Sequence, residues 1–460
     1  MTSLPRLPLL VLLLAATAQF HVFAEERPNI LLIVADDLGW ADVGWHGGRF
    51  KTPHMDRLVR EGVELDRHYV QPVCTPTRSS LLSGRWNSRF GPQTLTPSNL
   101  RAFLPGTITL AGALREAGYQ TAISGKWHLG SRKEWGPNAY GFDHSYGALT
   151  GAVDPWTHKY RAGEYVDTWH RDGQFLREEG NATELVVSEA CSQIRSLKGP
   201  WFLYVPFFAV HIPVDAPEDY KRLYEGVRFH DDPAKDESLH RFAAFVSQLD
   251  AKIGEMISAL EQTSQRRNTL VVFTSDNGGL SSGSNPYVGN TPSSPALSSN
   301  LPLRGQKNQL HEGGIRVCAF ANWPGTLQPS KLTTSVHAAD WMPTFTALAG
   351  WKPSEPPRFD GMNIWPLLTG SSAEAAPRPI YIKHPSGSVL LHDGWKLIAY
   401  KARKDAAPRQ ELYHVRDDPS ETKDLATTEP ERLQQMSALL EEVSRGDVNE
   451  LPKDLAGFHP

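Results

Sequence analysis

A cysteine stands near the start of segment 71–85, QPVCTPTRSSLLSGR, which has the pattern of a short helix. Thr75 can cap this helix and Gly84 can end it. Free N–H groups and a positive dipole end at a helix N-terminus both favour an anion. Arg78, one turn along, adds a fixed positive charge. The segment therefore predicts anion chemistry around Cys74, although a buried structural cysteine on a capped helix has the same local pattern.

Two pairs of oxygen-bearing side chains each follow an apolar run directly. Asp36 and Asp37 form the first pair, and Asp276 and Asn277 form the second. Adjacent aspartates repel one another unless a cation lies between them. Hard oxygen ligands suit Ca²⁺ or Mg²⁺ better than zinc. The pairs predict a metal site, whereas any one of these aspartates alone could be a helix cap or a turn residue.

Further cationic and imidazole side chains follow other apolar runs. Lys126 and His128 lie two positions apart, and in an extended segment both would face the same way. His211 follows a third apolar run, and Lys307 precedes the turn at Gly313. Each alone is an ordinary surface lysine or structural histidine. Together with the carboxylates they predict a site for an anionic substrate.

The elements that would position these residues alternate between apolar runs and amphipathic segments. Continuous apolar runs predict strands buried on both faces, as in a parallel sheet. Ligands bind at the carboxyl ends of such strands, so the polar groups are expected to meet in one crevice. This predicts an α/β fold with a large mixed, mostly parallel sheet flanked by helices. The predicted strands are 28–35, 119–124, 201–210 and 270–273, and the predicted helices are 107–117 and 236–262.

The composition and the hydrophobic pattern of the chain change after about residue 366. An Ala/Ser/Pro-rich linker at 371–379 precedes short, turn-separated strands and a final amphipathic helix. We expect a small C-terminal α+β domain, 371–460, with an antiparallel sheet, after a catalytic domain spanning 25–370. The predicted strands are 380–382, 388–391, 395–400 and 411–415, and the predicted helix is 431–443.

The N-terminal segment and the overall composition indicate where the protein is located and which classes of partner it is expected to bind. Residues 1–24 combine a weakly positive start, a short apolar core and small residues, which predicts a secretory signal peptide and an exported protein. A membrane anchor is the alternative, but the apolar run is short. A net charge of −4 among 460 residues gives no global basic field, so nucleic acid is not an expected partner. Three cysteines leave open whether Cys191 and Cys318 pair.

The segment 278–305 is rich in Ser, Asn, Gly and Pro. A loop of this length is either disordered or functional, and it directly follows the second oxygen-bearing pair. We therefore expect it to line the substrate site.

The Cys-x-Pro-x-Arg pattern with the following Ser-Leu-Leu-Ser-Gly-Arg resembles the signature of the type I, formylglycine-dependent sulfatases. Other motifs match the same family in its order, from about residue 27 to residue 425. They are Asp36-Asp37, the segment 125–130 (GKWHLG), His211, the segment 275–278 (SDNG) and the segment 313–316 (GGIR). The resemblance implies the alkaline-phosphatase-like α/β fold and hydrolysis of sulfate esters, with sulfated carbohydrate as the expected substrate of an exported member.

By the same resemblance, a separate formylglycine-generating enzyme oxidises Cys74 to an aldehyde. The hydrated aldehyde offers one hydroxyl to attack sulfur and a second to release sulfate, which a thiol cannot do. Asp36, Asp37, Asp276 and Asn277 would bind one Ca²⁺ ion, with the modified Cys74 as a further ligand.

The remaining roles are implied in the same way. Arg78 and Lys126 would stabilise the aldehyde hydrate and the sulfate, and Lys307 would hold the sulfate. His128 would assist the hydroxyl groups and His211 would protonate the leaving oxygen. Thr150 is the nearest candidate for a hydroxyl residue that relatives often carry after a Gly-Phe-Asp stretch.

Two other functions remain open at this stage. A phosphomonoester or phosphonate hydrolase could use the same scaffold, because phosphate resembles sulfate in shape and charge. A sulfatase-like binding protein without catalysis is the third possibility. The sequence does not indicate the sulfated position, exo or endo action, or the oligomeric state.

Overall fold

Residues 27–281, 297–372, 377–402 and 408–458 are described by the structure, a computed structural model of the chain. The predicted signal peptide, 1–24, lies outside these ranges, as does the middle of the predicted substrate loop, 282–296. Among the described residues, no helix has both the length and the apolar composition to cross a membrane.

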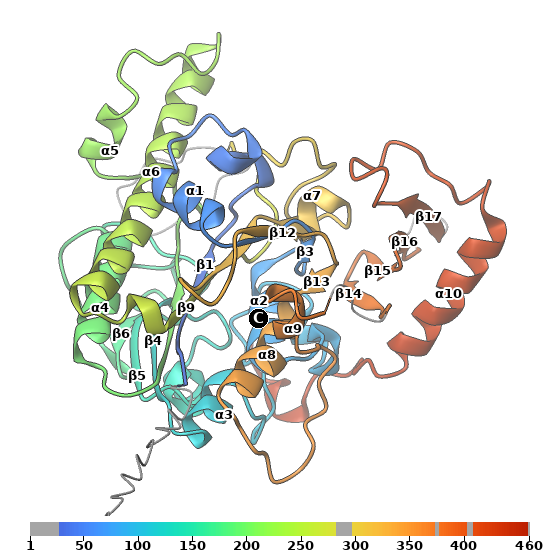
Figure 1. The fold of residues 1–460 in the computed structure, drawn as a ribbon, viewed down its shortest axis with the longest axis horizontal. Helices are drawn as coiled ribbons and strands as arrows, with labels where there is room; N and C mark the ends of the chain where they lie inside the picture. Colours follow the sequence, from blue (N-terminus) through green and yellow to red (C-terminus); the bar gives the residue numbers. More distant parts are fainter. Residues whose placement is uncertain (1–26, 282–296, 373–376, 403–407, 459–460) are drawn as a thin grey trace, which may run out of the picture.

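A ten-stranded sheet lies at the centre of the molecule, in the order β12-β2-β11-β9-β1-β8-β4-β5-β6-β7 (Figure 1). The consecutive strands β9, β1, β8, β4 and β5 are parallel, and antiparallel pairs join the strands beyond them, apart from the parallel pair β12 and β2. This confirms the predicted α/β class. The strands are β1 (Asn29–Ala35), β2 (Val63–Leu65), β4 (Gln120–Lys126), β5 (His144–Ala148), β6 (Trp169–Arg171), β7 (Gln174–Phe175), β8 (Trp201–Pro206), β9 (Thr269–Ser275), β11 (Ala319–Asn322) and β12 (Ser330–Leu332).

Helices cover both faces of this sheet (Figure 1). Because side chains alternate along a strand, Leu31 and Ile33 of β1 pack on one face, and Ile30, Leu32 and Val34 on the other. The first face packs against α1 (Pro53–Arg60), α4 (Ala182–Ser196) and α6 (Pro233–Gln262). The second packs against α2 (Cys74–Ser83), α3 (Leu110–Glu116), α8 (Trp341–Leu348) and α9 (Trp365–Leu368).

The predicted elements are present, with shifted ends. Helix α6 begins at Pro233, where the Asp232 carboxylate accepts hydrogen bonds from the N–H groups of Ala234 and Lys235. Helix α3 begins later than predicted, after its cap Thr109. Strand β8 stops at Pro206, so the predicted strand 201–210 was too long, and its second half is the loop that leads to His211. A proline cannot donate a ladder hydrogen bond, which accounts for the early end.

Thr75 does not cap helix α2, contrary to the prediction. The helix begins at Cys74 itself, with Val73 as its N-cap. The Thr75 hydroxyl instead donates to the carbonyl of His128 (3.2 Å) and accepts from the N–H of Ser98 (3.3 Å). Gly84 ends the helix in the left-handed conformation (φ 66°), as predicted. Thr75 therefore ties the helix start to the segment that carries His128.

A smaller antiparallel sheet follows in the C-terminal part of the chain, as predicted. It consists of β14 (Ile380–His384), β15 (Gly387–His392), β16 (Trp395–Tyr400) and β17 (Arg409–His414), with α10 (Pro430–Ser444) packed against it. In Figure 1 this unit lies beside α7 (Glu312–Ile315). Its other face shares a buried cluster with Tyr69, Leu310 and Ile315. A boundary at residue 370 stays a prediction.

The described part of the chain also contains a small three-stranded sheet and one further α-helix. The sheet has the order β10-β3-β13 and joins segments that lie far apart in the sequence. Its strands are β3 (His68–Tyr69), β10 (Arg316–Val317) and β13 (Val336–His337), and the helix is α5 (Glu218–Arg222).

Candidate functional site

The predicted polar groups meet because they follow four neighbouring strands. Strands β9, β1, β8 and β4 are adjacent and parallel, so their carboxyl ends lie at one edge of the sheet. Asp276 follows β9, Asp36 follows β1 and Lys126 is the last residue of β4. Backbone hydrogen bonds hold these ends together, from Asp276 N to Ala35 O (3.0 Å) and from Asp36 N to Ala209 O (2.9 Å).

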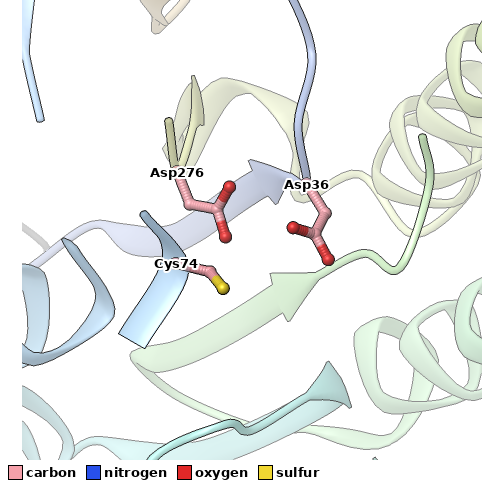
Figure 2. A group of neighbouring side chains, drawn as sticks. All are labelled: Asp36, Cys74 and Asp276. Carbon is pink, nitrogen blue, oxygen red and sulfur yellow. The ribbon is translucent and has the colours of Figure 1, made fainter. Parts of the chain in front are cut away.

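Cys74 lies opposite two of these carboxylates (Figure 2). Its Sγ and one carboxylate oxygen each from Asp36 and Asp276 lie within 4.8 Å of one another. The three side chains come from α2 and from the ends of β1 and β9, and all are buried. Burial raises the pKa of the Cys74 thiol, although Lys126 and Lys307 act in the other direction. At neutral pH this cysteine is therefore a protonated thiol, the weakly nucleophilic form.

We call the group of side chains around Cys74 at these strand ends the centre. Each of its carboxylates has a cationic partner. Lys126 Nζ lies 2.6 Å from Asp36 Oδ2, and Lys307 Nζ lies 2.6 Å from Asp37 Oδ1. Arg78 donates from Nε (3.0 Å) and Nη2 (2.7 Å) to Asp276 Oδ2. Its Nη1 donates to the carbonyl of Lys126 (3.2 Å), so Arg78 fixes both a carboxylate and the end of β4.

The oxygen atoms of the centre fit a hard cation. Among the described residues, Asp36 Oδ1 and Asn277 Oδ1 are buried and accept no hydrogen bond. A buried oxygen without a donor is costly, and a bound cation would remove that cost. Burial and, after it, the neighbouring Asp276 raise the pKa of Asp36 to about 8, although Lys126 acts in the other direction. Asp37, Asp276 and Asn277 complete an oxygen set that suits Ca²⁺.

Asp37 is held in an unusual backbone conformation that aims it at several partners. Its φ of 62° lies in the left-handed region, which is sparsely populated by residues other than glycine. Its carboxylate accepts from Asn277 Nδ2 (2.7 Å) and Lys307 Nζ. Burial opposes ionisation, but Lys307 and His211 lower the pKa of Asp37 to about 2.

His128 reaches the site by a different route from the predicted one. Strand β4 ends at Lys126, and His128 has a φ of 56°, so the two residues do not share an extended segment. The His128 ring is buried against Gly151, where an added Cβ would lie 2.3 Å from its Cε1 and Nε2 atoms. Burial and the charges of Lys126 and Arg78 lower the pKa of His128 well below its usual value.

His211 is a second histidine near the carboxylates, and its ring lies close to Asp37. Its Nδ1 lies 2.6 Å from the carbonyl of Ile212, so Nδ1 is the donor and Nε2 faces Asp37 Oδ2 at 3.7 Å. Burial and the charge of Lys307 lower the pKa of His211 to about 3. In the neutral ring, Nε2 is therefore a lone-pair acceptor.

The loop carrying Lys307 is attached to two other parts of the site. The Lys307 N–H donates to Gly279 O (3.2 Å), and the Asn308 N–H donates to Pro72 O (2.8 Å). These bonds explain why a lysine far along the chain reaches Asp37. They also place Asn308 beside the segment that leads into Cys74.

The structure thus brings together the predicted metal ligands, cations and histidines, and it also answers whether Cys191 and Cys318 pair. Thr150 is buried and donates to Ala152 O (3.2 Å). Cys191 and Cys318 are buried, unpaired thiols.

Sequence reasoning missed one residue at the centre, Tyr204. It lies in β8 beside Arg78 and Asp276, and burial raises its pKa to about 12. A tyrosine inside an otherwise apolar strand was the available signal, since a buried hydroxyl needs a polar neighbour.

Comparison with known proteins decides the family. The sulfatase family model matches residues 28–351. The chain belongs to the sulfatase family. This sulfatase-family enzyme has the alkaline-phosphatase-like fold that the resemblance implied, since it superposes on the crystal structure of Ps i-CgsB in complex with k-i-k-neocarrahexaose with a TM-score of 0.81. That alignment has 29% identity and covers 92% of this chain and 94% of that one.

Two curated relatives agree with this family. Arylsulfatase J of Mus musculus is 35% identical over 79% of this chain, and this chain spans 60% of its length. N-acetylgalactosamine-6-sulfatase of Rattus norvegicus is 31% identical over 83% of this chain, which spans 72% of that protein. The family is therefore supported both by sequence and by fold.

Proposed function

We propose that this protein hydrolyses sulfate monoesters of carbohydrates at the centre formed around Cys74. One observation carries the proposal: Cys74 Sγ lies within 4.8 Å of carboxylate oxygens of Asp36 and Asp276, and these two carboxylates and that of Asp37 are each paired with a lysine or an arginine. A sulfate ester needs charge neutralisation on its oxygens, a nucleophile at sulfur and a proton for its leaving oxygen. The centre offers a residue for each need.

The nucleophile is the least obvious part, because the buried thiol at position 74 is protonated. We propose that a formylglycine-generating enzyme converts Cys74 to an aldehyde. Its hydrate would supply a hydroxyl for attack and a second hydroxyl for release of sulfate. Ca²⁺ held by Asp36, Asp37, Asp276 and Asn277 would supply positive charge next to position 74.

The cations divide into two roles. Lys126 and Lys307 carry their ammonium groups on flexible stems, so each could exchange its carboxylate contact for sulfate oxygens. Arg78 is fixed by its bonds to Asp276 and to the carbonyl of Lys126, so it orients the centre as much as it neutralises charge. His128 is the proposed acceptor of a proton from the hydroxyl groups at position 74.

His211 is the proposed general acid for the leaving oxygen. Because its Nδ1 donates to Ile212 O, Nε2 carries a proton only in the imidazolium form. Burial and the charge of Lys307 oppose that form in the free enzyme, whereas Asp37 at 3.7 Å favours it, and the negative charge of a bound sulfate ester would favour it further.

Carbohydrate is the proposed substrate class because two similar proteins are named for it. One relative is an N-acetylgalactosamine-6-sulfatase, and one structural neighbour holds k-i-k-neocarrahexaose. Export follows from the predicted signal peptide at residues 1–24.

Paired rates on 4-nitrophenyl sulfate and 4-nitrophenyl phosphate test the reaction. Protein co-expressed with a formylglycine-generating enzyme and supplied with Ca²⁺ should show kcat/KM for the sulfate at least about 100-fold above that for the phosphate. The reverse preference would indicate the phosphomonoester hydrolase that the sequence left open. Hydrolysis of neither ester, with sulfated sugar still bound, would indicate the binding protein.

A further inference from the structure

Two of the described charged or imidazole side chains at the centre keep more solvent contact than its carboxylates, Arg78 and Lys126. His211 and Lys307 retain some exposure, with 9% and 12% of their side chains accessible. The other charged side chains of the centre are 0 to 2% exposed: Asp36, Asp37, Arg78, Lys126 and Asp276. We therefore expect the organic part of a bound ester to lie on the side of His211 and Lys307.

A cavity of about 420 Å³ lies against the loop that carries Lys307. It lies between the loop that carries Lys307 and the C-terminal sheet, and its volume is within the range of small-molecule sites. Asn308 lines it and directly follows Lys307, while the Asn308 N–H donates to Pro72 O, two residues before Cys74. The lining side chains that bear polar groups include Arg304, Asn308, His311, His384, Ser386 and Tyr400.

The lining suits an anionic, hydroxyl-rich ligand. No carboxylate is among the described residues that line the cavity. Arg304 is exposed and donates from Nη1 to Tyr413 Oη (3.0 Å) and Glu421 O (3.3 Å). Its Nε and Nη2 donors have no hydrogen-bond partner within the described ranges. A guanidinium anchored at one nitrogen in this way keeps two donors for an acidic group.

The nearest acidic side chain behind the lining is already compensated. Glu411 lies 3.2 Å from His311 Nε2 and 3.0 Å from Arg409 Nη2, and it accepts from Tyr400 Oη (3.3 Å). On the other wall, His384 is fixed between Asn308 Oδ1 (3.0 Å) and Ser386 Oγ (2.7 Å). The cavity therefore presents the guanidinium of Arg304, which Glu411 and Glu421 keep charged, and fixed polar groups.

A buried ion-pair cluster fixes the two walls relative to each other. Lys396 of β16 lies 3.0 Å from Glu312 Oε1 and 2.8 Å from Glu421 Oε1, and all three side chains are buried. Glu312 begins α7, a few residues after Lys307. The C-terminal sheet is thus held in register with the loop that carries Lys307, which preorganises the cavity.

We propose that this cavity binds the sugar next to the sulfated one, with Arg304 pairing an acidic group on that neighbouring sugar. The acidic group is a second sulfate or a carboxylate, which share the geometry that a guanidinium recognises. This inference rests on the proposed function for the location of the scissile sulfate. It makes the substrate an acidic oligosaccharide rather than an isolated sulfated monosaccharide.

Calorimetric binding tests the cavity without depending on turnover. The full chain carrying Cys74→Ala is titrated with a carrageenan tetrasaccharide, whose neighbouring sugar carries sulfate, and with a chondroitin 6-sulfate tetrasaccharide, whose neighbouring sugar carries carboxylate. Galactose 4-sulfate and N-acetylgalactosamine 6-sulfate serve as the single-sugar references. At least one tetrasaccharide should bind about tenfold or more tightly than its reference, and the one that does so identifies the acidic group.

Adding Arg304→Gln should remove most of that gain, while the reference sugar shifts by less than about twofold. His384→Gln, with a melting curve for each variant, provides a second change in the same cavity and should also weaken the tetrasaccharide selectively. The matched control is Arg416→Gln, an exposed arginine of the same C-terminal unit that pairs with Asp393 and does not line the cavity.

Equal weakening of tetrasaccharide and reference would mean that Arg304 acts only through structure, and would overturn the proposal. So would tetrasaccharides that bind no better than their references, or that do not bind. Intact selective binding in a wild-type protein that fails to hydrolyse aryl sulfate would instead contradict the proposed function and leave the cavity assignment in place.

Discussion

Lys307 contacts a buried carboxylate of the centre and is also partly exposed to solvent. Its ammonium group lies 2.6 Å from Asp37, and 12% of its side chain is exposed. Burial lowers its pKa, but Asp37 and its other acidic neighbours outweigh this and raise the pKa above the usual value, so it stays charged at every working pH. A charged group at the mouth of the centre is well placed to hold sulfate.

Lys307→Ala should therefore reduce kcat/KM on aryl sulfate by about 100- to 1,000-fold, the usual cost of removing one preorganised charge partner of a transition state. Steady-state rates measure the loss. Lys352→Ala changes an exposed lysine of the same chain and should have no effect. A loss below about threefold for Lys307→Ala would remove this residue from the reaction.

Metal binding is a second prediction at the residue scale. Ca²⁺ at 100 times its Kd should stabilise the wild-type fold by roughly 2.7 kcal/mol, because it binds only the folded oxygen set. A chelator should lower Tm, and added Ca²⁺ should restore it. Asp36→Asn removes one of the proposed ligands and should abolish the Ca²⁺-dependent rise in Tm. An equal rise in that variant would place the ion elsewhere.

Among elements, the loop after β5 matters because it supports the His128 ring. A Cβ at Gly151 would lie 2.3 Å from two ring atoms, so the ring or the loop has to move. We expect Gly151→Ala to lower kcat by about tenfold or more, since small displacements of a positioned group are costly.

Gly457→Ala is the control for this glycine substitution. A Cβ there meets no atom within 4 Å, so rates and Tm should stay at wild-type values. Wild-type kinetics for Gly151→Ala would show that the His128 ring tolerates displacement and is not a positioned catalytic group.

Some site residues could be predicted from sequence patterns of the elements that carry them, and others could not. Asp36, Lys126 and Asp276 were predictable because a continuous apolar run followed by a polar residue describes the end of a buried strand. The position of His128 was not, since its left-handed φ of 56° depends on the bond from Thr75 to its carbonyl and on the packing of Gly151. The contact between Lys307 and Asp37 could not be predicted from a local pattern either, because the two residues are 270 positions apart in the sequence.

In the whole molecule, the C-terminal sheet is joined to the centre by the buried pairs of Lys396 with Glu312 and Glu421. Its strands could be predicted from short turn-separated apolar runs, but its docking against α7 could not. The buried charges that pair there are far apart in the sequence, so the sequence alone does not predict which of them pair.

Lys396→Met should lower the free energy of unfolding by about 3–5 kcal/mol, because two buried carboxylates lose their cation. Denaturant unfolding measures the loss. The double variant Lys396→Met/Glu421→Gln should be less destabilised than the sum of the single variants, since it removes one of the stranded charges. Strict additivity would mean that Lys396 and Glu421 do not interact.

The mass of the peptide that carries Cys74, taken from catalytically active protein, tests the central claim most directly. If position 74 is the precursor of an aldehyde nucleophile, the peptide should have the mass of the formylglycine form, and activity should rise with the fraction converted. Full activity on sulfate esters in protein whose Cys74 peptide keeps the unmodified thiol would contradict the account.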